Sequence, residues 1–313
     1  AMLIGETMNV LVMGSGAVGS YYGAILAKSG HTVNFVARGD HFRAIEAQGL
    51  TVESQDAETY NVKVNISHKP DPTIPFDLIL FTVKAYDTHD AVKSMLGSIS
   101  DNTSILTLQN GFESGQEIQS LIQKGTVLEG PAYTVCTIRS PGVVQQIGNV
   151  NRLLLGPVNP KDLDKADTLT KQLSDSGWPI ELTNFPQREL WSKLVFLGPL
   201  AGLTSIVPLT AGEIRANAHT LKTIEDMMGE YAAVGNVCGA NLASDVVGQS
   251  IKTLHRYPAN GSTSMAKDWN SGKKTEIEAL LGSVIRKAKD HRIDMPITSS
   301  IYGLLTSTAR INK

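Results

Sequence analysis

Three glycines follow a short apolar run near the start of the chain, in the order Gly14-Ser15-Gly16-Ala17-Val18-Gly19. In such a pattern the first glycine permits a tight turn, the second lets a diphosphate approach bare backbone, and the third lets a helix pack against the strand. The amides at the start of that helix would face the diphosphate at the positive end of the helix dipole. A strand-like run, 9–13, precedes the glycines and a helix-like run, 21–28, follows them. This context predicts a dinucleotide-binding turn.

Arg38 stands at the end of the second predicted strand, 31–37, about 20 residues beyond the glycines, where an NAD-selective fold usually carries an acid for the ribose 2′-hydroxyl. The first acid here, Asp40, comes two residues later. A guanidinium can hold a 2′-phosphate by paired, charge-assisted hydrogen bonds. An arginine at a strand end is also a common surface residue, but its distance from the glycines favours NADPH as the cofactor.

Polar side chains follow two continuous apolar runs, 77–83 and 104–108, which read as strands covered on both faces. Lys84 follows the first run, and Gln109-Asn110-Gly111 follows the second. Loops at the carboxyl ends of parallel strands are where such sheets bind ligands. Either residue alone could be an ordinary polar loop start. Together with the glycine turn, they are expected to face the nicotinamide half of the cofactor.

Lys193 and Glu276 are candidates for proton chemistry. Lys193 shares the apolar face of a predicted helix, 189–197, with Leu190 and Leu197. A lysine that extends its ammonium from the edge of a core face is the usual explanation. The alternative is a partly desolvated ammonium whose lowered pKa suits proton donation. Glu276 falls in the first turn of another predicted helix, 273–291, where an acid is favourable for the helix dipole alone.

The elements that must position these residues divide the chain in two. Strands and helices alternate through the first half, with an antiparallel excursion at 49–66, further strands at 151–155 and 179–182, and a helix at 163–176. Helical periodicity then takes over, with candidates at 189–197, 213–238, 244–254, 273–291 and 296–309. We therefore predict an α/β protein: a Rossmann-type, doubly wound parallel sheet over 1–185 and an all-α C-terminal domain over 186–313. The expected active site is the cleft between the carboxyl edge of the sheet and the helical domain.

Composition limits the function classes. A chain of 313 residues with 42% hydrophobic content can bury a real core, and a net charge of −2 offers no basic field for nucleic acid. Cys136 and Cys238 make neither a disulfide framework nor a metal site, which suits a reducing compartment. The most apolar stretch, 194–209, is short and broken by glycine and proline, so neither a membrane span nor a signal peptide is indicated. We expect a cytoplasmic protein that contacts neither membrane nor nucleic acid.

The chain resembles the ketopantoate reductase (2-dehydropantoate 2-reductase) family from about Met8 to its C-terminus. Seven blocks typical of that family occur in order: the glycine fingerprint, Ala37-Arg38-Gly39-Asp40-His41 with Ala44-Ile45 and Gly49-Leu50, Val83-Lys84-Ala85, Gln109-Asn110-Gly111, Leu190-Trp191-Ser192-Lys193-Leu194, Ser264-Met265, and Thr275-Glu276-Ile277. Seven ordered blocks are far more specific than any one of them.

The resemblance implies an N-terminal NADPH domain and a helical domain that carries the proton donor. By this comparison Lys193 is the general acid, Glu276 is its carboxylate partner, and Asn110 and Ser264 contact the substrate. The implied cofactor contacts, besides the residues of the glycine turn, are Arg38, Lys84, Asn110, Cys136 and Glu276. The implied substrate is a 2-oxo acid, and a homodimer is a possible assembly.

One departure from the family concerns the substrate. Family members usually present asparagines four and eight residues after the lysine and again about ten residues further on, where this chain has Leu197, Ala201 and, approximately, Ala211. The leading expectation is the NADPH-dependent reduction of a 2-oxo acid to a 2-hydroxy acid. A D-2-hydroxyacid dehydrogenase for a branched or aromatic 2-oxo acid and a catalytically silent NADPH-binding sensor are the alternatives. Asn260, Ser262 and Thr263 could replace part of the missing amide contacts.

Overall fold

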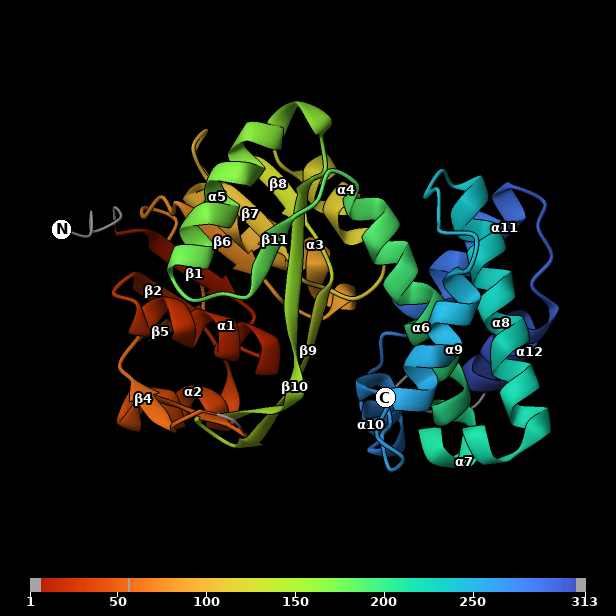
Figure 1. Ribbon diagram of the computed structural model, residues 1–313. Helices are drawn as coiled ribbons and strands as arrows, with labels where there is room; N and C mark the ends of the chain where they lie inside the picture. The colour runs from red at the N-terminus through yellow and green to blue at the C-terminus, as the bar shows by residue number, and fades with distance from the viewer. Residues whose placement is uncertain (1–6, 56, 308–313) are drawn as a thin grey trace. The chain divides into compact units, whose positions relative to one another are not determined.

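The computed structural model describes residues 7–55 and 57–307 and divides into two compact units (Figure 1). The first, the sheet unit, holds the described residues up to 109 and those from 114 to 186. The second, the helical unit, holds 110–113 and the described residues from 187 onward. The division expected at residue 185 falls one residue before the observed one. The sequence pattern did not predict that 110–113 belong to the helical unit.

The sheet unit is built on an eleven-stranded sheet with the order β4-β3-β10-β8-β7-β6-β1-β2-β5, in which β9 and β11 also pair with β10. The strands are β1 (Asn9–Met13), β2 (Thr32–Val36), β3 (Leu50–Ser54), β4 (Tyr60–Val62), β5 (Asn65–Ser67), β6 (Leu78–Phe81), β7 (Ser104–Thr107), β8 (Thr126–Glu129), β9 (Ala132–Ser140), β10 (Val143–Pro157) and β11 (Ile180–Leu182). The six strands from β8 to β5 run parallel, which confirms the predicted fold class. β10 joins β8 in the antiparallel direction, so the sheet as a whole is mixed.

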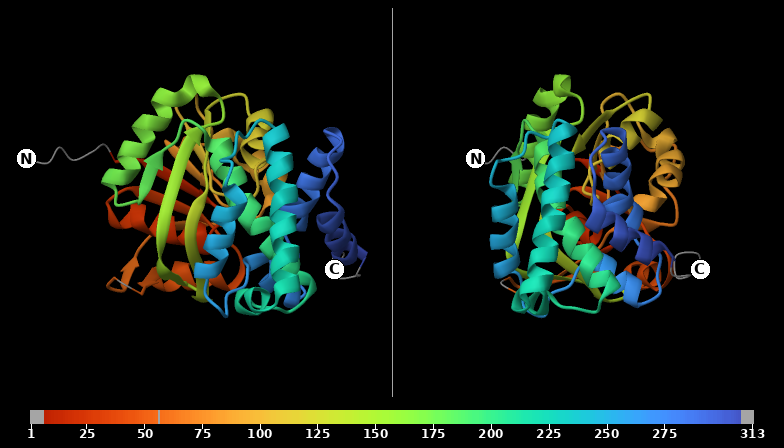
Figure 2. Two further views of the ribbon diagram at one scale, coloured as in Figure 1. Left: turned by 45° about the vertical axis from the view of Figure 1, so that its right-hand side comes forward. Right: turned by 90° about the vertical axis from the view of Figure 1, so that its right-hand side faces the viewer.

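Helices cover both faces of this sheet, as Figures 1 and 2 show. They are α1 (Ala17–Lys28), α2 (Gly39–Gln48), α3 (Thr88–Met95), α4 (Ser114–Leu121) and α5 (Leu163–Asp175), with short 3₁₀ turns at 85–87, 96–98 and 160–162. Val10 and Val12 of β1 pack with side chains of α1 and α5, whereas Leu11 and Met13 pack with those of α3 and α4. Successive strand residues point to opposite faces, so a continuous apolar strand serves both layers.

The chain leaves β1 towards β2 on one side and later returns to β6 on the other side of β1. Such a reversal of strand order opens a crevice at the carboxyl ends of the two strands, and ligands of open α/β sheets bind there. The glycine turn follows β1, and Lys84 follows β6 three residues beyond its end. The topology therefore places the glycine turn and Lys84, which are both predicted to contact the cofactor, at this reversal of strand order.

The helical unit contains no strand among its described residues. Its elements are α6 (Pro186–Ile206), α7 (Ala211–Ala216), α8 (Ala218–Val237), α9 (Val246–Arg256), α10 (Ser264–Asn270), the π-helix η4 (Glu278–Gly282), α11 (Ser283–Asp290) and α12 (Pro296–Ser307). Their inward side chains form one core around Trp191, Tyr231 and Leu281, each at most 1% exposed. No helix among the described residues is long and apolar enough to cross a membrane.

Several predicted helix bounds need correction. The helix expected at 213–238 breaks at Asn217, whose side-chain oxygen caps α8 by accepting from the amides of His219 and Thr220. The helix expected to end at 197 continues through Pro199 to Ile206. The helix expected from 273 begins only at Ile277, so Glu276 immediately precedes it. Short capping side chains and a tolerated proline move these ends, and α10 is a helix that the sequence pattern did not predict.

The β9–β10 hairpin is the largest element that our sequence analysis misses, because only 151–155 was expected as a strand. Its turn is Pro141-Gly142, and Gly142 has φ +78°. A proline followed by a residue with positive φ is the signature of a type II turn, and it stands here between two runs rich in β-branched residues. That turn signal could have located the hairpin.

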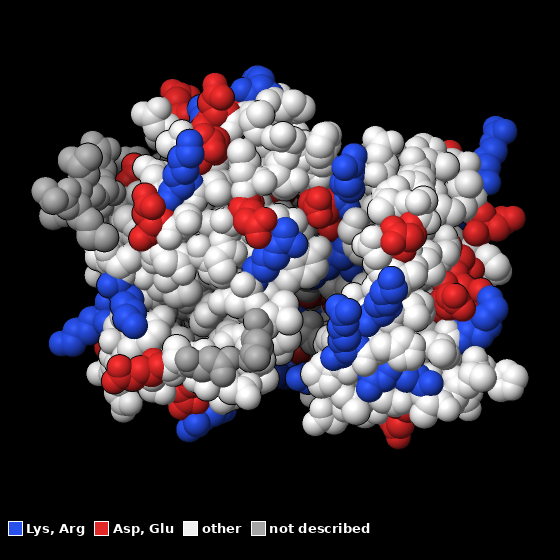
Figure 3. Space-filling view, viewed as in Figure 1, with Lys and Arg blue, Asp and Glu red and all other residues white. Residues whose placement is uncertain are grey.

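Charged side chains of both signs lie interspersed on the face of the sheet unit that Figure 3 presents. This agrees with the small net charge of −2.

Candidate active site

The glycine turn between β1 and α1 has the geometry that a bound diphosphate requires. Gly14 has φ +107°, and a Cβ there would lie 2.6 Å from the backbone nitrogen of Val83. A Cβ at Gly19 would lie 2.3 Å from the Gly14 carbonyl oxygen, whereas one at Gly16 would meet no atom within 4 Å. Thus the first and third glycines allow close packing behind the turn. The second leaves open space in front of it, where a diphosphate would approach the backbone.

Hydrogen bonds from both neighbouring strands hold the back of the turn. The Thr82 hydroxyl, just after β6, donates to the Gly14 carbonyl at 2.7 Å. The Ser15 hydroxyl donates to the carbonyl of Val36, the last residue of β2, at 2.8 Å. The first amides of α1 have no acceptor within the helix, as at any helix start. The turn therefore fits the diphosphate of a dinucleotide.

Arg38 directly precedes α2 with an exposed side chain. Asp40 pairs with Arg43 instead. In the part of the chain that the structure describes, no carboxylate lies within ion-pair distance of Arg38. An exposed guanidinium without an acidic partner suits an anionic ligand such as a 2′-phosphate.

Gln109 and Asn110, although adjacent, belong to different units. The Gln109 amide is buried and donates to the Val83 carbonyl and to the Thr88 hydroxyl, both at 2.9 Å, which ties the ends of β6 and β7 together. Lys84 precedes the 3₁₀ turn 85–87. Gln109 thus has a structural role, while Asn110 is presented to the helical unit.

Asn110 and Lys193 meet in the helical unit, where the Lys193 ammonium donates to the Asn110 side-chain oxygen at 2.9 Å. The segment 110–113 is fastened there by further contacts. The Phe112 ring stacks on Trp191 with centroids 4.3 Å apart, and the Gln187 amide donates to the Phe112 carbonyl at 3.1 Å. Two residues that are 83 positions apart in sequence are thereby held together.

The environment of Lys193 lowers its pKa, as the hypothesis of a partly desolvated proton donor requires. Burial lowers the pKa of Lys193 to about 8, although the Glu276 carboxylate acts in the opposite direction by favouring the charged ammonium. Glu276 is only 6% exposed. A desolvated ammonium with a nearby carboxylate can donate a proton at neutral pH and recover it from solvent. The structure therefore brings Lys193, Asn110 and Glu276 into one cluster.

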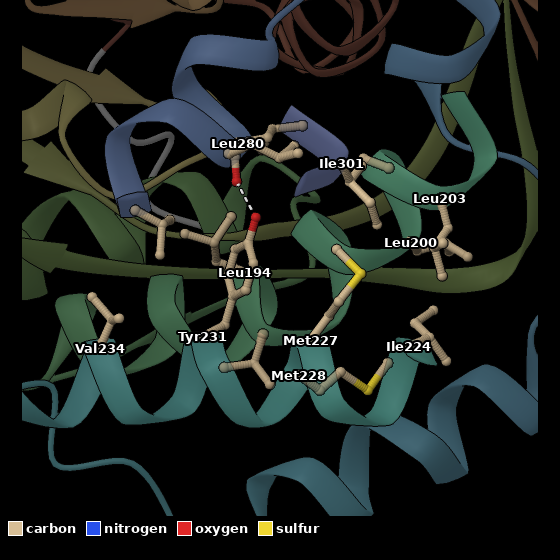
Figure 4. Close-up of a cluster of buried hydrophobic side chains, with 14 of the residues drawn as sticks. Leu194, Leu200, Leu203, Ile224, Met227, Met228, Tyr231, Val234, Leu280 and Ile301 are labelled. Atoms are coloured by element: carbon tan, nitrogen blue, oxygen red, sulfur yellow. Dashed lines mark hydrogen bonds between the residues drawn. The ribbon is translucent and has the colours of Figure 1, made fainter. Parts of the chain in front are cut away.

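A buried tyrosine lies between the helix of Lys193 and the helix that follows Glu276 (Figure 4). The Tyr231 hydroxyl of α8 donates to the Leu280 carbonyl in the π-helix at 2.7 Å. A Cβ on Gly198 would lie 2.3 Å from the Tyr231 ring, so only glycine leaves room on α6 for that ring. π-turns inside helices often mark functional sites. Nothing in the sequence pattern indicates this contact.

The predicted substrate residues differ in accessibility. Leu197 lies one turn beyond Lys193 on α6 and is half-buried, whereas Ala201 and Ala211 are completely buried. Ser264 is exposed at the first position of α10, whose N-cap is Thr263. Of the three positions that depart from the family pattern, only Leu197 is partly exposed. The predicted set of substrate residues is therefore reduced at these positions to Leu197, because Ala201 is a core residue.

Cys136 lies on β9, is half-buried, and has its sulfur 3.5 Å from the Thr134 hydroxyl. Burial raises the pKa of the Cys136 thiol to about 11. The thiol is therefore uncharged and unreactive at neutral pH. Its predicted contact with the cofactor remains a prediction.

Comparison with known proteins agrees with this geometry. Residues 10–160 match the family "Ketopantoate reductase PanE/ApbA", and 186–309 match its C-terminal domain. A 2-dehydropantoate 2-reductase of Halobacterium salinarum is 27% identical over 304 residues, which are 97% of this chain and 99% of that protein.

Two solved structures show the same architecture. A ketopantoate reductase of Ralstonia eutropha superposes with a TM-score of 0.87 at 31% identity, over 95% of this chain and 97% of its own. A D-mandelate dehydrogenase with NADH and anilino(oxo)acetate superposes with a TM-score of 0.88 at 21% identity, over 95% and 97%, and shares the fold. With both family domains matched in order, this chain belongs to the ketopantoate reductase family of oxidoreductases.

Proposed function

We propose that this protein reduces a 2-oxo acid to the 2-hydroxy acid with NADPH. The observation that carries the proposal is the contact of Lys193 with Asn110 at 2.9 Å, in surroundings that lower the lysine pKa to about 8. A proton donor of this kind is what a carbonyl reduction needs from the protein, because the negative charge that develops on oxygen must be neutralised.

The residues present fit NADPH. The open space at Gly16 suits the diphosphate, and Arg38 offers a charged fork for the 2′-phosphate. When bound, NADPH would supply the hydride to the C2 carbonyl carbon of the substrate. The predicted contacts of Lys84 and Cys136 with the cofactor belong to this proposal.

Lys193 would then complete the reduction. Its ammonium would polarise the C2 carbonyl oxygen and transfer one proton to it as the C–O double bond becomes single. The neutral amine left behind would recover a proton from solvent. Asn110 would keep the ammonium in place, and the Glu276 carboxylate would favour its charged form until transfer. The atoms balance as one hydride to carbon and one proton to oxygen.

Leu197 favours an apolar substrate within this class. Ketopantoate carries a terminal hydroxyl that an asparagine can hydrogen-bond, and a leucine cannot. Burying that hydroxyl without a partner costs roughly 1–3 kcal/mol. We therefore propose a branched or aromatic 2-oxo acid as the preferred substrate.

A panel of 2-oxo acids, followed by the loss of NADPH absorbance, tests the proposal. Ketopantoate, branched aliphatic 2-oxo acids and phenylpyruvate form the panel, and product chirality identifies the hydroxy acid. We expect turnover with at least one member, and a loss of turnover in Lys193→Met but not in Lys222→Met on the exposed face of α8. If NADPH binds and no member is reduced, the chain is the NADPH-binding sensor rather than a reductase.

A further inference from the structure

His41 lies three residues beyond Arg38, at the start of α2, and joins two other elements of the sheet unit. The backbone amide of Gly142, in the β9–β10 turn, donates to His41 Nδ1 at 3.1 Å. The other ring nitrogen, Nε2, lies 3.2 Å from the hydroxyl oxygen of Ser20 on α1. Both ring nitrogens are therefore engaged, each with a group from a different part of the fold.

These two contacts determine the tautomer of the ring. Nδ1 accepts from an amide, so it carries a lone pair and no proton. In a neutral imidazole the proton is then on Nε2, which donates to the Ser20 oxygen. Protonation would place an N–H on Nδ1 opposite the N–H of Gly142, which removes the acceptor and sets two donors face to face. The arrangement requires a neutral histidine, and burial lowers the pKa of His41 in agreement with that.

Ser20 links His41 to the glycine turn through two hydrogen bonds. Because its oxygen accepts from His41, its own hydrogen is available, and it donates to the Ser15 carbonyl at 3.2 Å. Ser15 is the residue between the first two glycines of the fingerprint, and its amide and hydroxyl both donate to the Val36 carbonyl, at 3.2 and 2.8 Å. Val36 ends β2, two residues before Arg38.

We propose that His41 is a positioning residue for the cofactor. Through Ser20 it fixes the Ser15 peptide from behind, so that the amides at the start of α1 keep one orientation towards the diphosphate. Through α2 it also keeps the glycine turn in a fixed position relative to Arg38, the residue assigned to the 2′-phosphate. The inference rests on the proposed function, because it concerns how well the sheet unit binds NADPH.

Other groups near α2 are charged or titratable, and they must be separated from His41 in any pH measurement: Arg38, Asp40, Arg43 and Glu46 on its own helix and cap, His68 and Lys69 after β5, and Glu53 and Arg139 on β3 and β9. Asp40 pairs with Arg43, and Glu53 pairs with Arg139. His68 stacks on Phe42 and faces the Ala37 carbonyl. The 2′-phosphate of NADPH also titrates near pH 6.

The test compares the dissociation constants of NADPH for variants of the full chain by calorimetry at pH 7.5. His41→Leu should weaken binding about 5- to 50-fold, as expected when a buried hydrogen-bond chain is cut. Ser20→Ala should weaken it to a similar degree, and the double variant should be no worse than either, because both break one chain. His41→Gln supplies an acceptor and a donor that do not titrate, and should bind within about threefold of the unmodified chain.

Two readouts distinguish positioning from general support of the fold. Imidazole ¹⁵N shifts should show the Nε2-protonated neutral tautomer of His41 without any cofactor. Between pH 7.5 and 5.5 the unmodified chain should lose more affinity for NADPH than His41→Gln. Titration of the 2′-phosphate affects both proteins equally, so it cancels in this comparison. His89→Leu, at an exposed histidine on α3, is the matched control and should behave as the unmodified chain.

A correctly folded His41→Leu variant that binds NADPH within about twofold of the unmodified chain overturns the proposal, as does an Nδ1-protonated tautomer. The thermal melting curve of each variant establishes that it is folded. Failure of the proposed function has different signatures. The unmodified chain then binds neither NADPH nor NADH, or it binds NADPH and reduces no 2-oxo acid, and in the second case the His41→Leu measurement still decides the present proposal.

Discussion

Lys193 is a half-buried residue whose ammonium combines two properties that usually exclude each other, a positive charge and desolvation. The contact with Asn110 and the nearby Glu276 carboxylate keep the ammonium form accessible, while desolvation brings its pKa to about 8. An ordinary lysine with a pKa near 10.4 would hold its proton too tightly at neutral pH to be an efficient acid. Burial is thus the physical means by which this residue becomes suited to proton transfer.

The first prediction concerns this acid. Lys193→Ala should lower kcat by about 10²–10⁴-fold, the usual range for general acid catalysis, with NADPH affinity nearly unchanged. The active form is the protonated one, so activity should be full below the pKa of about 8 and should fall as the pH rises through it. Steady-state kinetics between pH 6 and 10 measure both effects. An alanine variant that keeps most of its kcat would return Lys193 to the status of a core-edge lysine.

Arg38 determines the choice of cofactor in a second prediction. Arg38→Ala should lose a paired contact to the 2′-phosphate, which costs about 1.5–3 kcal/mol, or about 10- to 150-fold in kcat/KM with NADPH. The value with NADH should hardly change, because NADH has no such phosphate. Arg139→Ala, at another exposed arginine of the sheet unit, is the control. Equal kcat/KM for the two cofactors in the unmodified protein would contradict the assignment.

A third prediction concerns Leu197 and the substrate. Leu197→Asn should shift the kcat/KM ratio towards ketopantoate over an apolar 2-oxo acid by about 5- to 150-fold, the equivalent of 1–3 kcal/mol. Ala201→Asn should instead destabilise the helical unit, because that position is completely buried in its core. Leu304→Asn, at an exposed leucine of α12, should change neither quantity. A preference of the unmodified enzyme for ketopantoate over every apolar analogue would show that other polar groups hold the hydroxyl.

At the scale of elements, α6, α8 and the π-helix position Lys193 and Glu276, the proposed acid and its proposed carboxylate partner. Tyr231 of α8 fills the space that Gly198 of α6 leaves, and its hydroxyl reaches the Leu280 carbonyl. The Leu280 amide in turn donates to the Glu276 carbonyl at 3.0 Å. Two hydrogen bonds therefore link the tyrosine to the backbone of Glu276.

Tyr231→Phe tests that link. Loss of the hydroxyl leaves a buried carbonyl without its partner and should cost about 1–3 kcal/mol of unfolding free energy. We also expect kcat to fall about 3- to 30-fold with KM nearly unchanged, because small displacements of catalytic groups are costly. Gly198→Ala should act in the same direction by displacing the ring. Tyr22→Phe alters a buried tyrosine of the sheet unit, and Gly229→Ala alters an exposed glycine of α8 where a Cβ would meet no atom within 4 Å, so both should leave kcat unaffected.

Sequence pattern predicted the parallel sheet and the helical second half because apolar periodicity reflects burial directly. It did not predict the split at Asn217 or the π-helix, which depend on single side chains and on distant partners. The same holds for the site. The glycine turn is local and was readable, whereas the meeting of Lys193 with Asn110 across 83 positions depends on the tertiary fold. Only the resemblance to a family indicated that these two residues share a role.

At the scale of the whole molecule, the chain crosses between its two units more often than a simple two-domain order would require. Residues 110–113 leave the sheet unit at the end of β7, join the helical unit, and return to begin α4. Phe112 is 6% exposed within the helical core, and Glu113 lies 3.9 Å from Arg286. The helical unit therefore includes a segment that is distant in sequence, because its last residue, Glu113, lies 74 positions before Gln187.

This dependence yields the last prediction. Phe112→Ala removes a ring that stacks on the fully buried Trp191, so it should destabilise the protein by about 3–5 kcal/mol, the usual cost of such a cavity. Hydrogen exchange should locate the loss of protection in α6 and α8, although the altered residue lies between strands of the sheet unit in sequence. Because the same segment holds Asn110 against Lys193, Phe112→Leu should lower kcat even where the fold survives.

Phe76→Ala is the matched control, since Phe76 is also buried but packs with α3 in the sheet unit. Its loss of protection should appear around β6 and α3 and leave α6 and α8 unchanged. If both variants lost protection in the same segments, the two units would unfold as one cooperative body. In that case Phe112 would be a general core residue, and the anchoring of 110–113 would have no separate effect on Lys193.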